Sequence, residues 1–218
     1  MIAAVVFDMD GVLIDSEHVW DGVREALAHE RGGRWHPGAQ RDMMGMSSPE
    51  WSAYMHDELG VPLDPQAIND EVVERIEARY RQGLPLLPGA VEAVRGLAGR
   101  WPLGLASSSN REIIDLVLRE AGLVAEFAVT LSSEEVDRGK PAPDVYLEAA
   151  RRLGARPARC VAVEDSGNGM RSAAAAEMTV IALPNPHYPP DPEALALAAT
   201  TLDSLHRLTP ALIERLAA

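Results

Sequence analysis

The stretch "VVFDMDGVLIDSE", residues 5–17, places a short apolar run directly before several acids. The apolar run is typical of a buried strand, and Asp8, Asp10, Asp15 and Glu17 follow it at once. Carboxylates crowded at the end of a strand repel one another and are costly to remove from water. A divalent cation would offset that cost, so the stretch predicts a metal site at the end of the first strand.

The composition of the 218 residues limits the classes of partner. A net charge of −13 disfavours binding to DNA, RNA or an anionic membrane. No apolar run approaches the roughly 18 residues of a membrane span, and the first residues lack the basic segment of a signal peptide. The lone cysteine, Cys160, fits a buried thiol in a reducing compartment. We therefore expect a cytoplasmic protein, and without a coiled-coil pattern we expect a monomer.

The order of apolar segments predicts an α/β fold. Continuous apolar runs without alternation are typical of parallel strands covered on both faces. Helical patterns near 89–98, 111–121 and 144–153 separate most of them, and Asn110 is expected to cap the second of these helices. The prediction is a Rossmann-like open parallel sheet, with strands at Ile2–Phe7, Pro102–Ala106, Ala128–Leu131, Cys160–Val163 and Val180–Leu183.

A long segment without strand patterns follows the first strand. Three helices are predicted there: one near 17–30, one beginning at "SSPE" with a Ser47–Glu50 capping box, and one running from Asp64 to Gly83. We interpret 16–83 as a small helical cap domain inserted into a core formed by 1–15 and 84–218. The hinges between the two are expected near 14–17 and 83–88.

Side chains able to do chemistry follow the predicted strands. In open α/β sheets, ligands bind beyond the carboxyl ends of the strands. One cleft is therefore expected to hold several acids, a hydroxyl and an ammonium. The chain has nineteen arginines and a single lysine, and that lysine falls among these residues. The predicted members are Asp8, Asp10, Ser107, Lys140, Glu164 and Asp165.

Four segments resemble the ordered motifs of the haloacid dehalogenase-like hydrolase superfamily: "DMDGVLIDSE", "ASSS", "GKPAPD" and "VEDSGNGM". The resemblance spans essentially the whole chain. The helical insert after the first motif is similar to the branch that contains beta-phosphoglucomutase and small sugar-phosphate phosphatases. "DSEHVWD", "PLLPG" and "EDSGNGM" resemble hexose-phosphate phosphatases such as 2-deoxyglucose-6-phosphatase.

The resemblance implies a Mg²⁺-dependent hydrolase of a small phosphate monoester, a sugar phosphate, with an aspartyl-phosphate intermediate. Asp8 would be the nucleophile and Asp10 the general acid and base. The implied metal ligands are Asp8, the backbone carbonyl of Asp10, and Asp165, with Glu164 close by. The phosphoryl oxygens would be held by Ser107, Lys140 and backbone N–H groups near Gly11 and Ser108.

Three alternative functions share features with this sequence. A beta-phosphoglucomutase-type phosphoryl transfer needs a cationic pocket in the cap, and the family's arginine is replaced in the first cap loop by Ser48 and Pro49. A receiver-like signalling module also combines acids with a Lys-Pro pair, but here that pair precedes the second acidic pair. A dehalogenase would lack the second aspartate, so Asp10 favours phosphoryl transfer.

The cap is expected to contact the substrate near the hinge. Trp20, His18, Ser47 and the turn 43–48 are the predicted contacts, because they adjoin the hinge and the first cap loop. Trp51 and Tyr54 lie at helical spacing and are expected to be core residues of the cap.

Overall fold

The computed structural model describes residues 1–44 and 46–216, which contain a parallel sheet of six strands in the order β3-β2-β1-β4-β5-β6. This order puts β1 in the middle of the sheet, where the chain reverses the direction in which it adds strands. The strands are β1 (Ala4–Phe7), β2 (Leu103–Ser107), β3 (Phe127–Ser132), β4 (Cys160–Glu164), β5 (Thr179–Ala182) and β6 (Ala198–Thr201).

The five predicted strands are confirmed, with ends that differ by one or two residues, but the sequence prediction missed β6. That strand reads "AATT", and its residues are only partly buried. It pairs with β5 alone at the edge of the sheet, so no buried apolar run marks it in the sequence.

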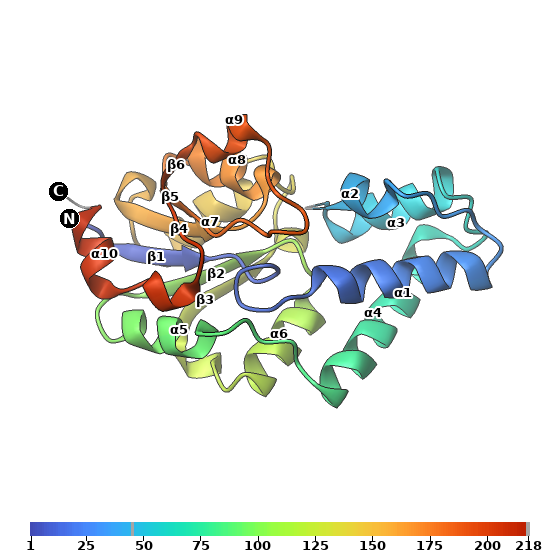
Figure 1. Ribbon diagram of the computed structural model, residues 1–218, viewed down its shortest axis with the longest axis horizontal. Helices are drawn as coiled ribbons and strands as arrows, with labels where there is room; N and C mark the ends of the chain where they lie inside the picture. The colour runs from blue at the N-terminus through green and yellow to red at the C-terminus, as the bar shows by residue number, and fades with distance from the viewer. Residues whose placement is uncertain (45, 217–218) are drawn as a thin grey trace.

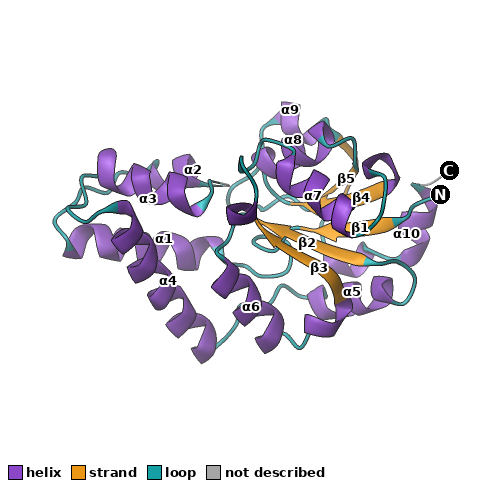
Figure 2. Cartoon of the chain, turned by 180° about the vertical axis from the view of Figure 1, so that it is seen from behind, coloured by secondary structure: helices purple, strands orange, loops and turns teal. Residues whose placement is uncertain are grey.

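Helices cover both faces of the sheet (Figure 2). Val5 and Phe7 of β1 face one apolar cluster, whereas Ala4 and Val6 face the other, because successive strand residues point to opposite sides. The first cluster includes residues of α5 (Ala90–Ala98), α6 (Arg111–Glu120) and α10 (Pro210–Arg215). The second includes residues of α7 (Asp144–Arg152), α8 (Gly167–Ala175) and α9 (Pro192–Leu195). Short 3₁₀ helices are η1 (Val124–Glu126), η2 (Ser133–Glu135), η3 (Pro157–Arg159) and η4 (Leu205–Arg207).

The predicted cap segment is helical and lies to one side of the sheet (Figure 1). Its helices are α1 (Glu17–Glu30), α2 (Ala39–Met43), α3 (Ser48–Asp57) and α4 (Pro65–Gln82). Glu50 accepts hydrogen bonds from the N–H and the hydroxyl of Ser47, which confirms the predicted capping box. Three helices were predicted; α2, only five residues long, was missed because so short a segment shows no apolar periodicity.

The chain leaves and re-enters the core at adjacent points. Ile14 pairs with Leu86, the N–H of Asp15 donates to Pro85 at 2.8 Å, and the N–H of Leu87 donates to Leu13 at 2.9 Å. The division into a core (1–15 and 84–218) and a cap (16–83) stays a prediction, and the two names are used below for these segments. Within the described residues, no helix has both the length and the apolar character needed to cross a membrane.

Candidate active site

Lys140 joins the carboxyl ends of three strands. From the loop after β3, its Nζ donates to Asp8 Oδ1 at 2.9 Å, to Glu164 Oε1 at 2.6 Å and to the carbonyl of Ala106 at 3.1 Å. The lysine side chain is 2% exposed, and the side chains of Asp8 and Glu164 are 8% and 0% exposed. A compact ammonium can make these three bonds at once, which a planar guanidinium cannot imitate.

Burial and neighbouring charges shift the pKa values of the residues around Lys140. Burial raises the pKa of Asp8 to about 8, helped by Glu164 and Asp10 and opposed by Lys140. Burial also raises the pKa of Asp165 well above its usual range, and the Glu164 and Asp8 carboxylates add to the shift. For Lys140, burial alone would lower the pKa, but Asp8 and Glu164 more than offset it and keep the ammonium charged. The site therefore has more negative charge than its one lysine balances.

The same carboxylates fit a divalent cation. Oxygens of Asp8, Glu164 and Asp165 lie within 4.8 Å of one another, and Asp165 Oδ2 is buried without a hydrogen-bond partner in the described residues. Glu164 is already engaged by Lys140, by the hydroxyl of Tyr146 at 2.7 Å and by the N–H of Asp165 at 3.1 Å. An oxygen-rich donor set suits Mg²⁺. Asp8 and Asp165 are thus the side chains best placed to hold it, and Glu164 is better placed to orient Lys140.

Asp10 faces the same pocket but has a different set of donors. Its Oδ2 accepts from Ser109 Oγ at 2.7 Å and from Ser107 Oγ at 3.3 Å, while its Oδ1 accepts from Trp20 Nε1 at 3.3 Å. The indole comes from the cap and the serines from the end of β2. Three donors hold the Asp10 carboxyl beside Asp8, in a position suited to passing a proton.

Two glycines allow the acids to approach the backbone. Gly11 has φ +75°, and a Cβ there would collide with the Asp165 carboxylate. Its N–H donates to the carbonyl of Ile14 at 2.8 Å, so in this structure that group does not face a phosphate as the sequence predicted. A Cβ at Gly169, in the first turn of α8, would likewise collide with the Glu164 carboxylate.

The pocket lies between core and cap and has a cavity volume of about 60 Å³. Typical ligand pockets hold roughly 300 Å³ or more, so we expect the cap to move when a substrate enters. Core and cap contribute residues to its walls. They are Asp8, Asp10, Glu17, Trp20, Arg24, Met43, Met44, Met46, Trp51, Ser108, Ser109, Lys140, Asp165 and Ser166.

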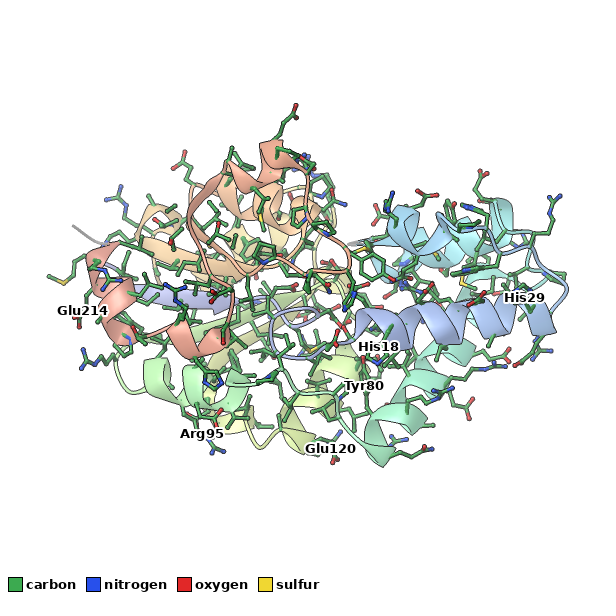
Figure 3. All side chains as sticks on the ribbon, in the orientation of Figure 1. His18, His29, Tyr80, Arg95, Glu120 and Glu214 are labelled. Atoms are coloured by element: carbon green, nitrogen blue, oxygen red, sulfur yellow. The ribbon has the colours of Figure 1, made fainter. Side chains whose placement is uncertain are left out.

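Only some of the predicted substrate contacts line the pocket. Trp20 lines the pocket, as do the described residues Met43, Met44 and Met46 of the turn 43–48; residue 45 lies outside the described residues. The His18 side chain is 65% exposed and faces Asp15 at the start of α1 (Figure 3). Ser47 is not among the lining residues, and it packs against Gly139.

Other predicted residues also differ from expectation. Ser107 is fully buried and touches Asp10 without lining the pocket, whereas Ser108 lines it. Trp51 is buried as predicted, yet it forms part of the pocket wall. Tyr54 is partly exposed, packs against the apolar cluster that includes Trp51 and donates to Asp42 at 2.9 Å, so it lies at the edge of the core rather than inside it.

Ser109 and Arg24 are among the pocket residues that sequence reasoning missed. Ser109 belongs to the "ASSS" motif, and its hydroxyl makes the shortest bond to Asp10. Arg24 follows Trp20 by four residues, so helical spacing places both side chains on one face of α1. That spacing could have indicated that Arg24 faces the pocket. It did not lead to a prediction, because an arginine is expected to face solvent.

Comparisons with curated proteins find relatives that match most of the chain. Hexitol phosphatase B of Escherichia coli K12 is 37% identical over 227 aligned positions, covering 95% of both chains. Fructose-1-phosphate phosphatase YqaB of the same strain is 33% identical and covers 82% of this chain and 95% of its own.

Solved structures share the fold across the whole chain. CbbY of Rhodobacter sphaeroides, in complex with phosphate, has a TM-score of 0.87 and 27% identity, covering 98% of this chain and 100% of its own. Beta-phosphoglucomutase of Clostridium difficile, at 22% identity, has a TM-score of 0.85 and covers 99% of this chain and 96% of its own. The model of the haloacid dehalogenase-like hydrolases matches residues 2–177. With these matches and the geometry above, the chain belongs to the haloacid dehalogenase-like hydrolase family.

Proposed function

We propose that the protein is a Mg²⁺-dependent phosphomonoesterase that hydrolyses a small sugar phosphate through a phosphorylated Asp8. The observation that carries this proposal is the buried contact of Lys140 with Asp8 at 2.9 Å, beside the unpartnered oxygen of Asp165. A nucleophilic carboxylate, a fixed ammonium and an open oxygen donor are the parts that phosphoryl transfer needs.

The reaction has two steps. In the first, an Asp8 oxygen attacks phosphorus, the bond from phosphorus to the ester oxygen breaks, and Asp10 gives its proton to the leaving alkoxide. In the second, Asp10 takes a proton from water as the water oxygen attacks phosphorus, the Asp8–phosphorus bond breaks, and inorganic phosphate leaves. Lys140 compensates charge on the phosphoryl oxygens in both steps.

The metal would be held by the carboxylates of Asp8 and Asp165 and by the backbone carbonyl of Asp10. When bound, Mg²⁺ supplies positive charge that offsets repulsion between the phosphate and the acids. Glu164 keeps Lys140 in place from behind the pocket, through the 2.6 Å contact.

The relatives support the substrate class. Proteins named for hexitol phosphates and for fructose 1-phosphate are 37% and 33% identical to this chain. Both kinds of substrate are small, polyhydroxylated phosphate monoesters. The pocket walls combine apolar cap residues with hydrogen-bonding groups, which suits such a molecule.

A panel of phosphate esters tests the proposal. Sorbitol 6-phosphate, fructose 1-phosphate, glucose 6-phosphate and 2-deoxyglucose 6-phosphate are incubated with the protein in Mg²⁺ or in excess EDTA, and released phosphate is measured. We expect turnover of at least one ester with Mg²⁺ and none with EDTA. Full turnover in EDTA would contradict the metal-dependent mechanism.

Mutase activity is the second candidate, and one observation favours it. The cap does place a cation on the pocket wall, Arg24, although its first loop lacks the arginine of beta-phosphoglucomutase. Beta-glucose 1-phosphate with catalytic glucose 1,6-bisphosphate separates the two activities. Release of inorganic phosphate supports the hydrolase; efficient formation of glucose 6-phosphate would replace it with a mutase.

A further inference from the structure

Arg24 is a buried cation without an acidic partner. The residue is 6% exposed, and its guanidinium carbon lies 4.7 Å from the centre of the Trp20 ring and 4.6 Å from that of Trp51. Within the described residues, its hydrogen bonding is limited to one long contact, from Nη1 to Gln40 Oε1 at 3.5 Å. The Nε atom is buried and has no partner among the described residues.

The nearby acids do not neutralise Arg24 by direct contact. Glu17, Asp10 and Asp21 lie close enough to favour its charged form, yet no ion pair within 4.0 Å joins any of them to Arg24 in the described residues. Glu17 instead accepts from Gln40 Nε2 at 2.7 Å, and Asp10 is held by Trp20 and two serines. Burial lowers the pKa of Arg24 to about 10, so it remains charged at neutral pH.

A buried guanidinium whose N–H groups lack acceptors destabilises the folded protein, unless a ligand supplies those acceptors. The two indoles contact the guanidinium on adjacent sides, because their ring centres lie only 6.1 Å apart, and neither neutralises its charge. The Nε–H group, which has no partner among the described residues, is left to bind a phosphate or carboxylate oxygen. Trp20 also bonds to Asp10, so a single indole separates the guanidinium from the catalytic aspartate. Arg24 and Lys140 thus lie in one pocket, one on the cap and the other on the core.

We propose that Arg24 forms a subsite for a second anionic group on the substrate, a distal phosphate or carboxylate, while Asp8 and Lys140 receive the phosphate that is cleaved. The inference rests on the proposed function and narrows its substrate class to phosphate esters with two anionic ends. The distal anion replaces the missing partner of Arg24 when the cap closes, so binding it also favours the closed form.

Matched pairs of substrates test the subsite. Fructose 1,6-bisphosphate is compared with fructose 1-phosphate, and 3-phosphoglycerate with glycerol 3-phosphate, so each pair differs in the distal anion. We expect the wild type to have a higher kcat/KM for the anionic member of at least one pair, and which pair responds distinguishes phosphate from carboxylate. Equal kcat/KM within both pairs, or a preference for the neutral members, would overturn the inference.

Variants then assign the preference to Arg24. Arg24→Met should lower kcat/KM for the preferred anionic member on the order of 30-fold or more, since one partner of a buried charge pair is lost. The neutral member should change only a few-fold, and Arg24→Lys should fall between. The matched control is Arg81→Met, which removes a cap arginine whose side chain is 57% exposed. An equal loss for both members would show that Arg24 is only structural.

Further controls distinguish a failure of this inference from a failure of the proposed function. If Arg24→Met unfolds, as judged by circular dichroism, Arg24→Lys and the wild-type preference decide the result. If the wild type releases phosphate from no ester, the proposed function is wrong. Calorimetric binding of the same pairs with Mg²⁺ then decides the subsite: tighter binding of an anionic member supports it, and equal binding overturns it.

Discussion

Asp8 and Asp10 are the same residue type two positions apart in one loop, yet their surroundings differ. Asp8 contacts the Lys140 ammonium and lies among the candidate metal ligands, whereas Asp10 contacts two hydroxyls and an indole. The Lys140 ammonium opposes the burial that raises the pKa of Asp8 and so favours the ionised form that could attack phosphorus. Two hydroxyls and an indole fix the position of the Asp10 carboxyl.

Substitution of each aspartate should separate these roles. Asp8→Asn removes the nucleophile, and we expect phosphate release to fall to background. Asp10→Asn keeps the backbone carbonyl for the metal but cannot move a proton, so turnover should fall roughly 10²- to 10⁴-fold. Steady-state kinetics on the best ester checks both. Retention of more than a few per cent of activity in Asp8→Asn would exclude a phosphorylated Asp8.

We expect Gly169 to be required for the position of the Glu164 carboxylate. It lies in a helix, where alanine ordinarily stabilises the folded state by about 1 kcal/mol relative to glycine. Gly169→Ala should lower both melting temperature and kcat, because its Cβ would displace the carboxylate that holds Lys140. The control is Gly96→Ala in α5, where a Cβ would meet nothing within 4 Å. That variant should keep its activity and be slightly more stable. Equal behaviour of the two variants would contradict this role of Gly169.

At the scale of elements, cap and core meet where α4 packs beside α6 and through a few hydrogen-bonded side chains. Trp20 reaches Asp10, Asn168 Nδ2 donates to the carbonyl of Met44 at 3.3 Å, and Asn110 Nδ2 donates to Asn69 Oδ1 at 3.0 Å. Asn110 begins α6 as predicted, but its side chain does not cap the helix, because it bonds to the cap and to Glu134. These hydrogen bonds can be exchanged for water, and the paired segments at Ile14 and Leu86 can act as a hinge.

We expect the cap to open without ligand and to close over a phosphoryl mimic. In X-ray scattering, Mg²⁺ with beryllium fluoride should reduce the radius of gyration, and crystal structures of the two states should differ at 14–17 and 83–88. Asp8→Asn is the control, since it lacks the carboxylate that would bind the mimic. Identical cap positions with and without the mimic would argue for a fixed cap.

At the scale of the whole molecule, the buried acids connect folding stability to pH and metal. Burial, with Glu164 and Asp10, raises the pKa of Asp8 from 3.8 to about 8, so the folded state holds this proton more tightly than the unfolded state does. The resulting stabilisation is present below pH 4 and is lost as pH rises towards 8. Glu17, with a pKa raised by burial to about 7, acts in the same direction.

Mg²⁺ should therefore stabilise the protein more at high pH than at low pH, because metal and proton compete for the same carboxylates. Melting temperatures are measured in EDTA and in Mg²⁺ at about pH 5 and about pH 8. We expect the metal-free protein to melt lower at the higher pH and the gain from Mg²⁺ to be larger there. Asp8→Asn should flatten both trends. A gain from Mg²⁺ that is the same at both pH values would contradict the linkage.

The sequence by itself determined the sheet and the residues at its carboxyl edge. Parallel strands buried on both faces require continuous apolar runs, and their carboxyl ends meet at one edge, so the sequence is enough to assign Asp8, Lys140 and Asp165 to one site. β6 could not be found in this way, because an exposed edge strand needs no such run.

Only the tertiary structure decided how the cap meets that edge. In the folded protein Arg24 packs against both Trp20 and Trp51, and the Gly11 N–H bonds within its own loop. His18 and Ser47 do not line the pocket. Helical periodicity states which residues share a face but not which helix that face will meet. The contact between α1 and α3 is set by long-range packing, and the environment of Arg24 exists only once those helices have met.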